Sequence, residues 1–478
     1  MVTTTDPLDT VTAAERRLRD PRLGLLTAVT RHPPGPGVPA AWVGYGAHVA
    51  ATEVYAPWTV DRYGFGASLG DPDQARRAAI GEAVERYCGN IVPEGLIVAS
   101  YEQLRRAGQR AVDPMDLALY SPQQYATAGF PFVAFTRDLP VAWVSGTCLH
   151  TGEPTLVPAA LAYLNYYTGS RRGEPPVTAL SYAGIATGVD RSHAERFALE
   201  ELFERDATTL WWLSGARSAL VTDAHRLVDQ LDDEWTAITG DTDLTATGEG
   251  SVAVRLRHVP SSFAVPVLAA FVTDHARGVV AFGSAARADP QTAATKALVE
   301  AIGMYTLTIK LTDPDSDLWE AVEQGIVPRH VFRPYRADRS YRDAFRADLR
   351  DLVDLPAVAQ LYLDPRMQGQ PLERLRAPEP TTVLDQIPAV PAERARQEYL
   401  TRLEQAGLRA VSVDLTTTDV AAAGLRVVRV LVAGLYGNCP PAFPLHGGRR
   451  LHTEPLARGW TAGPLTAADL ARPPIPLA

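Results

Sequence analysis

The chain has 478 residues, of which 46% are hydrophobic and 21% charged, enough for one large globular unit or two smaller ones with sizeable cores. The formal net charge of −9 gives no indication of a positively charged surface that would bind nucleic acid. Acidic residues interrupt the apolar runs of residues 1–30, and no later stretch could span a bilayer, so we expect a cytoplasmic protein without nucleic-acid or membrane partners. Cys88, Cys148 and Cys439 are odd in number and lack C-x-x-C spacing, which predicts reduced thiols.

The predicted elements begin with an N-terminal extension, residues 1–55. It holds a polar helix at 13–19, an apolar run at 25–30 and a Pro/Gly linker at 33–37. From residue 56 the pattern predicts a domain in which amphipathic helices alternate with short β-like runs, at 132–135, 141–144, 252–256, 265–272 and 427–431.

Two later segments are rich in proline. Residues 354–391 also carry many charges, which predicts a long surface excursion, and residues 473–478 form a tail. Taken together, the elements predict an α+β fold in a single large domain, 56–478, with mixed sheets flanked by helices.

A quasi-repeat is the most informative feature of the chain. In each copy, alanines precede a glutamate by seven and three positions, so that one helix face presents two small residues and then a carboxylate. The alanines permit close approach of neighbouring backbones. The three copies are Ala75-Ala79-Glu82, Ala194-Ala198-Glu201 and Ala293-Ala297-Glu300.

Capping signals support these three helices. Asp71-Pro72 and Asp289-Pro290 place a capping carboxylate before a proline in the first helical position. Ser192 is the predicted cap of the middle helix. Glycine-bearing segments at 64–66 and 184–188 precede the first two helices, and we expect turns there, either close to a ligand or as plain hairpins.

The first two helices share the pattern E-x-x-E-R. Glutamates three apart face the same way, and the arginine can pair with the first glutamate while its fork remains free for phosphate. Several such carboxylates in one cleft need a cation, and Mg²⁺ with a nucleotide meets that need. A salt-bridged, solvated helix face is the alternative. The two copies are Glu82, Glu85, Arg86 and Glu201, Glu204, Arg205.

Together these segments resemble the YcaO family. Residues 64–87 are similar to its first signature, 182–207 to its second and 283–305 to its third. Late segments agree as well, at 442–444, at 447–450 and in the proline-rich tail. The likeness covers nearly everything after residue 55, and it implies a cleft for Mg²⁺ and ATP between the helices.

The resemblance also implies roles for individual residues. A Cys, Ser or Thr side chain of a peptide attacks the preceding carbonyl, and ATP phosphorylates the resulting oxygen, which leaves as phosphate to give a thiazoline or oxazoline. Pro474 and Pro476 are expected to help order the active site. The implied Mg²⁺ ligands are Glu82, Glu85, Glu201 and Glu204, and the implied nucleotide-binding residues add Arg86, Arg205 and Glu300.

Four positions depart from the family signatures. Phe65 stands in place of a lysine, Ala78 in place of a serine, and Gly303 and Tyr305 in place of glutamine and arginine. The tail also ends in Ala478 rather than proline. Fewer cationic donors mean fewer charge-assisted contacts to a nucleotide.

Other motifs favour structural roles. Trp211 and Trp212 are expected in the core, and a structural role is favoured for His446 and His452. Residues 66–70 match G-x-S-x-G, but the helix cap three residues later argues against a nucleophile elbow. The chain has no P-loop motif.

Three functions are compatible with this sequence. The first is ATP-dependent cyclodehydration of a ribosomally made precursor peptide, as in bacteriocin maturation, with a separate leader-peptide-binding partner. The second makes a thioamide or amidine with the same ATP chemistry. The third is a degenerate member that binds peptide or scaffolds a complex. A homodimer is compatible with all three.

Overall fold

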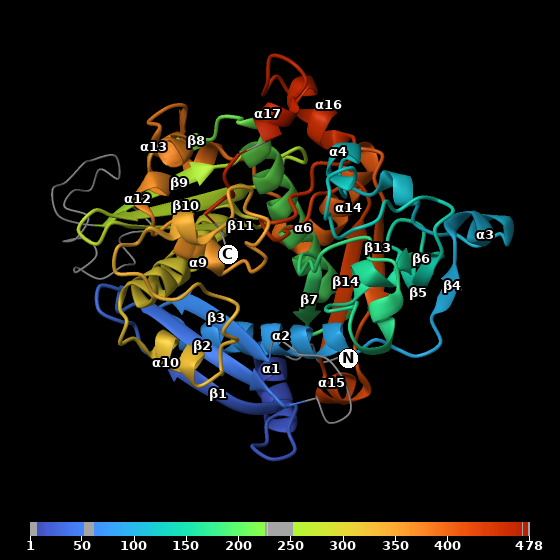
Figure 1. Ribbon diagram of the computed structural model, residues 1–478. Helices are drawn as coiled ribbons and strands as arrows, with labels where there is room; N and C mark the ends of the chain where they lie inside the picture. Colours follow the sequence, from blue (N-terminus) through green and yellow to red (C-terminus); the bar gives the residue numbers. More distant parts are fainter. Residues whose placement is uncertain (1–6, 52–61, 225–226, 228–251, 471, 477–478) are drawn as a thin grey trace.

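The computed structural model describes residues 7–51, 62–224, 227, 252–470 and 472–476. Within them the chain forms three sheets around the long central helix α6 (Arg191–Ser214), as Figure 1 shows. The α+β fold class predicted from the sequence is confirmed. Among the described residues, no helix combines the length and apolarity that a bilayer span requires.

Three consecutive strands form the first sheet, and the other two sheets also combine strands that are distant in the sequence. The first sheet has the order β1 (Leu26–His32), β2 (Trp42–Val49) and β3 (Tyr63–Leu69). The five-stranded sheet runs β11 (Val279–Ala286), β10 (Val267–Asp274), β9 (Val252–His258), β8 (Ala219–Val221) and β12 (Thr381–Thr382). The six-stranded sheet runs β4 (Ile97–Ala99), β5 (Val141–Cys148), β13 (Ala410–Asp414), β14 (Arg426–Val432) and β7 (Ile185–Gly188), and β6 (Pro154–Pro158) pairs with β5.

Two other long helices accompany α6, namely α2 (Pro72–Asn90) and α9 (Pro290–Thr312). The other α-helices of the described residues are shorter. They are α1 (Pro7–Leu18), α3 (Tyr101–Arg106), α4 (Pro122–Tyr125), α5 (Ala159–Ala162), α10 (Asp317–Glu323), α11 (Ala357–Leu361), α12 (Pro365–Gln368), α13 (Glu373–Arg376), α14 (Ala395–Gln405), α15 (Thr418–Ala423), α16 (Arg450–Ala457) and α17 (Ala467–Leu470).

Three edge strands lead into the three long helices. β3, β7 and β11 each lie at one end of a different sheet, and α2, α6 and α9 follow them directly. We call these pairs unit 1 (β3–α2), unit 2 (β7–α6) and unit 3 (β11–α9). The alanines of the sequence repeat are all fully buried, as expected for faces that pack closely.

Glycine on the strand and alanine on the helix make this packing possible. A side chain at Gly64 would place its Cβ 2.3 Å from the backbone nitrogen of Ala83, and one at Gly283 would lie 2.3 Å from that of Ala301. Each strand therefore lies directly on the backbone of its helix. The segment around Gly64, expected as a turn, belongs to strand β3 instead, because its glycines serve this close contact rather than a reversal of the chain.

The N-caps agree with the sequence for two of the three helices. Asp71 accepts a hydrogen bond from the Gln74 nitrogen, and Asp289 accepts one from the Thr292 nitrogen. The prediction of Ser192 as the cap of α6 is wrong. Asp190 is the cap, and it accepts from the backbone nitrogen of His193, because α6 begins one residue before Ser192.

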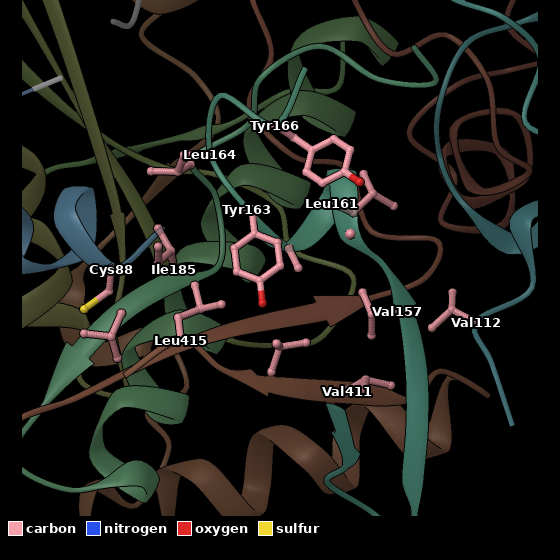
Figure 2. Close-up of a cluster of buried hydrophobic side chains, with 14 of the residues drawn as sticks. Cys88, Val112, Val157, Leu161, Tyr163, Leu164, Tyr166, Ile185, Val411 and Leu415 are labelled. Carbon is pink, nitrogen blue, oxygen red and sulfur yellow. The ribbon is translucent and has the colours of Figure 1, made fainter. Parts of the chain in front are cut away.

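Side chains from several sheets and helices meet in buried clusters. Figure 2 shows one of them, in which Cys88 of α2 and Ile185 of β7 lie in the same cluster as Val157 and Val411 of the six-stranded sheet. Units 1 and 2 therefore both contribute side chains to this cluster. Cys88, Cys148 and Cys439 are free thiols, as expected.

Two segments differ from their predicted conformation. Residues 132–135 form no strand, because Phe132 stacks on Tyr120 and meets Phe443 edge-on in an aromatic cluster. Residues 354–391 are not simply a surface excursion, because they contribute α11 to α13 and bury Leu361 and Leu375 completely.

The N-terminal extension shares a sheet with the rest of the chain. β1 and β2 come from it, and β2 pairs with β3 of unit 1. The predicted boundary at residues 55 and 56 lies outside the described residues and stays a prediction. The strands before and after it form a single sheet.

Candidate functional site

The first glutamate of units 1 and 2 is held by the backbone of its own unit, within β3 in unit 1 and directly before β7 in unit 2. The backbone nitrogen of Phe65 donates to Glu82 Oε2 at 3.0 Å, and that of Gly184 donates to Glu201 Oε2 at 2.9 Å; in both pairs the acceptor is 17 positions after the donor. This equal spacing shows that the sequence repeat is also a repeat in space. One oxygen of each carboxylate is fixed by the backbone, which orients the other.

Unit 3 holds its glutamate differently. Glu300 pairs with Lys296, which lies one turn earlier on α9. The Glu300 side chain remains 46% exposed. A salt bridge on the helix surface thus takes the place of the backbone donor used in the other two units.

The second glutamate of units 1 and 2 is held by the strand of the next unit. Thr187 of β7 donates its backbone N–H to Glu85 Oε1 at 2.7 Å, and Ser284 of β11 donates its hydroxyl to Glu204 Oε1 at 2.7 Å. In unit 3 the equivalent helix position is Gly303. These contacts join unit 1 to unit 2 and unit 2 to unit 3, which gathers the carboxylates between the helices.

Both arginines of the E-x-x-E-R pattern pair with the acidic groups. Arg86 Nη2 donates to Glu82 Oε1 at 2.7 Å, and its guanidinium group lies 3.8 Å from the ring centre of Tyr182. Arg205 Nη1 lies 3.2 Å from Glu204 Oε1. The arginines are thereby anchored beside the carboxylates.

Two of the carboxylates in the site, those of Glu85 and Glu201, have raised pKa values. Burial, together with the neighbouring carboxylates Glu82 and Glu201, raises the pKa of Glu85 to about 8. Burial also raises the pKa of Glu201. Desolvation alone would raise the pKa of Glu300, but Lys296, Arg205 and Arg287 together outweigh it and hold that pKa below its ordinary value. A cation near Glu85 and Glu201 would relieve this repulsion.

A single cleft brings the predicted residues together. Its volume is about 3020 Å³, larger than the roughly 300–1,000 Å³ of an ordinary small-molecule pocket. A nucleotide and a segment of peptide could share such a space. Its lining includes every predicted carboxylate and arginine, namely Glu82, Glu85, Arg86, Glu201, Glu204, Arg205 and Glu300.

The donors in this cleft fit Mg²⁺ together with a nucleotide. Over the described part of the chain, no three Asp, Glu, His or Cys side chains lie close enough to hold a metal ion by themselves. Mg²⁺ does not need such a cluster, because it usually takes one or two carboxylates and completes its shell with water and phosphate oxygens. The raised pKa of Glu85 and the paired arginines suit that mode of binding.

The structure also places the four departures from the signatures. Phe65 stacks on the tryptophan of β2, although its backbone nitrogen still holds Glu82. Tyr305 is fully buried and donates to Asp274 Oδ2 at 2.8 Å, so this side chain serves the core. Small side chains stand at the other two positions, Ala78 and Gly303, both in the cleft wall.

The proline tail is docked at the C-terminal end of α6. The indole Nε1 of Trp212 donates to the Pro473 carbonyl at 2.8 Å, and the Tyr362 hydroxyl donates to the Pro474 carbonyl at 2.5 Å. Pro476 is buried. Residues 473–476 are not among those that line the cleft, so the active-site role predicted for Pro474 and Pro476 stays a prediction. The end of the tail, at 477–478, lies outside the described residues.

Several motifs have structural roles, as expected. Trp211 and Trp212 are buried. Ser68 lies on β3, nearly inaccessible, and its hydroxyl is bonded to the Asp71 carbonyl, which rules out a nucleophile elbow. His446 does not line the cleft, and burial lowers its pKa to about 4.

Some residues that shape the site were not predicted from the sequence. Thr187 and Ser284 carry no local signal, because their glutamate partners lie on another unit. Lys296 could have been found, since a lysine four residues before a glutamate on a helix is a recognisable pair.

Comparisons with known proteins agree on the family. A family model described as YcaO cyclodehydratase, ATP- and Mg²⁺-binding, matches residues 64–436. A heterocyclase solved in complex with substrate and cofactor is similar with a TM-score of 0.67 and 20% identity, over 99% of this chain and 57% of that one. YcaO from Methanopyrus kandleri, bound with AMPPCP and Mg²⁺, gives a TM-score of 0.57 and 19% identity, over 93% of this chain and 96% of that one.

A curated relative is similar over a shorter stretch. The uncharacterized protein in the tfuA 3′ region of Rhizobium leguminosarum bv. trifolii is 31% identical over 141 residues, which is 29% of this chain. The chain spans 30% of that relative and 57% of the heterocyclase.

Because the family model covers most of the chain, this protein belongs to the YcaO family, and its single large domain has the fold of the YcaO heterocyclases. ATP and Mg²⁺ are the ligands of that family.

Proposed function

We propose that this protein is an ATP-dependent cyclodehydratase that forms thiazoline or oxazoline rings in a ribosomally made precursor peptide. One observation carries the proposal. Five glutamates and two arginines from three separate units line one cleft, and backbone or hydroxyl donors orient four of the glutamates. Such ordering of like charges is costly unless it serves a cationic ligand.

The proposed roles follow from the chemistry of each group. Glu82, Glu85, Glu201 and Glu204 would hold Mg²⁺, and Arg86 and Arg205 would pair with phosphate oxygens or keep the glutamates in place. Glu300 would complete the nucleotide site. ATP, when bound, supplies the phosphoryl group that turns the amide oxygen into a leaving group.

The volume of the cleft supports a second ligand beside the nucleotide. We propose that the precursor peptide enters the same space, so that its backbone amide meets the phosphates. A separate leader-peptide-binding protein and a homodimer stay predictions, as does an ordering role of Pro474 and Pro476 in turnover.

The first test is calorimetric titration with AMPPCP in Mg²⁺ and in EDTA. We expect binding with Mg²⁺ only, because carboxylates repel phosphates without a metal between them. Equal affinity in EDTA would contradict the carboxylate assignment, and no binding in either condition would favour a degenerate member.

The second test separates the reactions. A peptide carrying Cys, Ser or Thr is incubated with ATP, Mg²⁺ and the protein, and its mass is measured. We expect loss of one water per ring. Exchange of oxygen for sulfur would instead identify a thioamide-forming member. Condensation with an amine of the same peptide also loses water, so fragmentation has to locate the new bond.

A further inference from the structure

Two further arginines in the cleft wall share one buried carboxylate. The Nη1 atom of Arg196, on α6, lies 3.4 Å from Glu200 Oε1. The Nε atom of Arg287, which follows β11 directly, lies 3.6 Å from Glu200 Oε2. Glu200 is fully buried, and the Tyr399 hydroxyl donates to it at 3.1 Å. Both arginines line the same cleft as the site described above. We call Arg196 and Arg287 the arginine pair.

The arginine pair keeps donors available for a ligand. Its side chains are 26% and 23% exposed, and within the described ranges the Nη2 groups of both have no hydrogen-bond partner. The ring of Phe197 supports them, with its centre 4.4 Å from the Arg196 guanidinium carbon and 6.0 Å from that of Arg287. Glu200 carries one negative charge and the arginine pair two positive charges, so one charge of the pair remains for Glu300 and for a ligand in the cleft.

The arginine pair stands beside the glutamates of units 2 and 3. Arg287 lies three residues after Ser284, the residue that holds Glu204. Arg287 also acts on Glu300 electrostatically, together with Lys296 and Arg205. The pair therefore adjoins the carboxylates and is not a separate surface patch.

We propose that Arg196 and Arg287 bind phosphate oxygens of the nucleotide, with Glu200 as a positioning residue that holds both guanidinium groups against the cleft wall. This inference rests on the proposed function. Carboxylates outnumber Arg86 and Arg205 in the cleft, so a polyanionic ligand needs further cations besides Mg²⁺. Guanidinium forks match phosphate geometry, and anchoring reduces the entropy lost on binding.

The test is calorimetric titration with AMPPCP and Mg²⁺, without peptide. Arg287→Gln should bind roughly tenfold or more weakly, the usual loss for one charge-assisted hydrogen bond. Arg287→Lys should lie between this variant and wild type, because it keeps the charge but loses the fork. Arg196→Gln should weaken binding in the same direction.

Arg396→Gln is the matched control. Arg396 is 29% exposed and bound to Glu195, another buried glutamate of α6, but it does not line the cleft. The Arg396→Gln variant should bind AMPPCP with the affinity of the wild-type protein. If Arg287→Gln and Arg396→Gln weakened AMPPCP binding to a similar extent, the cause would be altered packing of α6, and the proposal would be overturned.

The positioning role of Glu200 is tested by a double-mutant cycle. If Glu200 acts through Arg287, the effect of Glu200→Gln on AMPPCP affinity should shrink in an Arg287→Gln background. Additive effects would overturn that role.

The remaining outcomes separate this inference from the proposed function. Wild-type affinity in both Arg287→Gln and Arg196→Gln, or loss of binding to an acidic peptide but not to AMPPCP, would overturn the inference alone. Failure of the wild-type protein to bind AMPPCP would overturn the proposed function as well. If Arg287→Gln does not fold, Arg287→Lys and Arg196→Gln still decide the matter.

Discussion

The backbone nitrogen of Thr187 donates to Glu85 Oε1 at 2.7 Å, which links strand β7 of unit 2 to helix α2 of unit 1. The Thr187 hydroxyl also donates to the Gly81 carbonyl on the same helix, at 3.0 Å. Two adjacent contacts therefore set the distance between the first two units. They hold Glu85 and Glu201 in one cleft, where each carboxylate depends on its neighbours for orientation.

Glu201→Gln should weaken nucleotide binding by roughly tenfold or more and leave stability nearly unchanged. Glutamine removes the charge offered to Mg²⁺, but its oxygen can still accept from the Gly184 nitrogen. AMPPCP titration and thermal unfolding measure the two effects.

Glu195→Gln is the matched comparison on the same helix. Glu195 is buried and bound to Arg191 and Arg396, outside the cleft lining. We expect a stability loss of about 1–3 kcal/mol with normal AMPPCP affinity. If Glu201→Gln instead lost stability at normal AMPPCP affinity, and Glu195→Gln lost affinity at normal stability, Glu201 would be a structural residue and Glu195 a residue of the site.

Gly64→Ala and Gly283→Ala should each destabilise the protein by about 3 kcal/mol or more. The added methyl group would lie 2.3 Å from helix backbone nitrogen atoms, which cannot move without separating strand from helix. Gly303→Ala is the control, because its nearest neighbour is a Trp42 ring atom at 3.7 Å. This variant should gain about 0.5–1 kcal/mol from helix propensity. Denaturant unfolding measures all three, and full stability of Gly64→Ala would contradict the close strand-helix contact.

His446 should make stability fall in acid. Burial lowers its pKa to about 4 from an ordinary value of 6.5. Between these two pH values the imidazole is protonated in the unfolded chain and neutral in the folded protein. Its contribution is complete above pH 6.5 and is lost as pH falls toward 4, by up to about 1.4 kcal/mol per pH unit. The measurement is the free energy of unfolding between pH 4 and 7. His446→Gln should show a shallower dependence, and an identical slope would show that His446 does not titrate abnormally.

Deletion of residues 473–478 should lower the free energy of unfolding. Deletion of a loosely attached tail would leave it unchanged. The truncation removes the carbonyl acceptors of Trp212 Nε1 and the Tyr362 hydroxyl, both on buried side chains, at a cost of about 1–3 kcal/mol each. AMPPCP affinity should persist, because residues 473–476 do not line the cleft. Tyr362→Phe tests one contact alone and should reproduce part of the loss. Wild-type melting temperature in the truncated protein would show that these contacts contribute nothing.

Turnover of peptide by the truncated protein tests the role predicted for Pro474 and Pro476. A large loss of turnover at unchanged AMPPCP affinity would support an ordering role in the active site. Turnover at the full-length rate would leave the tail a purely structural element.

Much of this protein is determined by local sequence. The spacing of alanines and glutamates, with capping residues such as Asp71 and Asp289, predicts three helices and the face of each that carries a carboxylate. These features depend on contacts within one or two helical turns, so a pattern a few residues long is sufficient. The same short patterns carry the resemblance to the YcaO family.

Tertiary structure decided how those faces meet. The strand around Gly64, the donors Thr187 and Ser284, the docking of Pro474 and the pairing of Arg287 with Glu200 all join residues distant in the sequence. No local pattern encodes such partners, because the edges of three different sheets must first be placed around α6. The helices and their carboxylates were therefore predictable, whereas the groups that orient them became visible only in the folded chain.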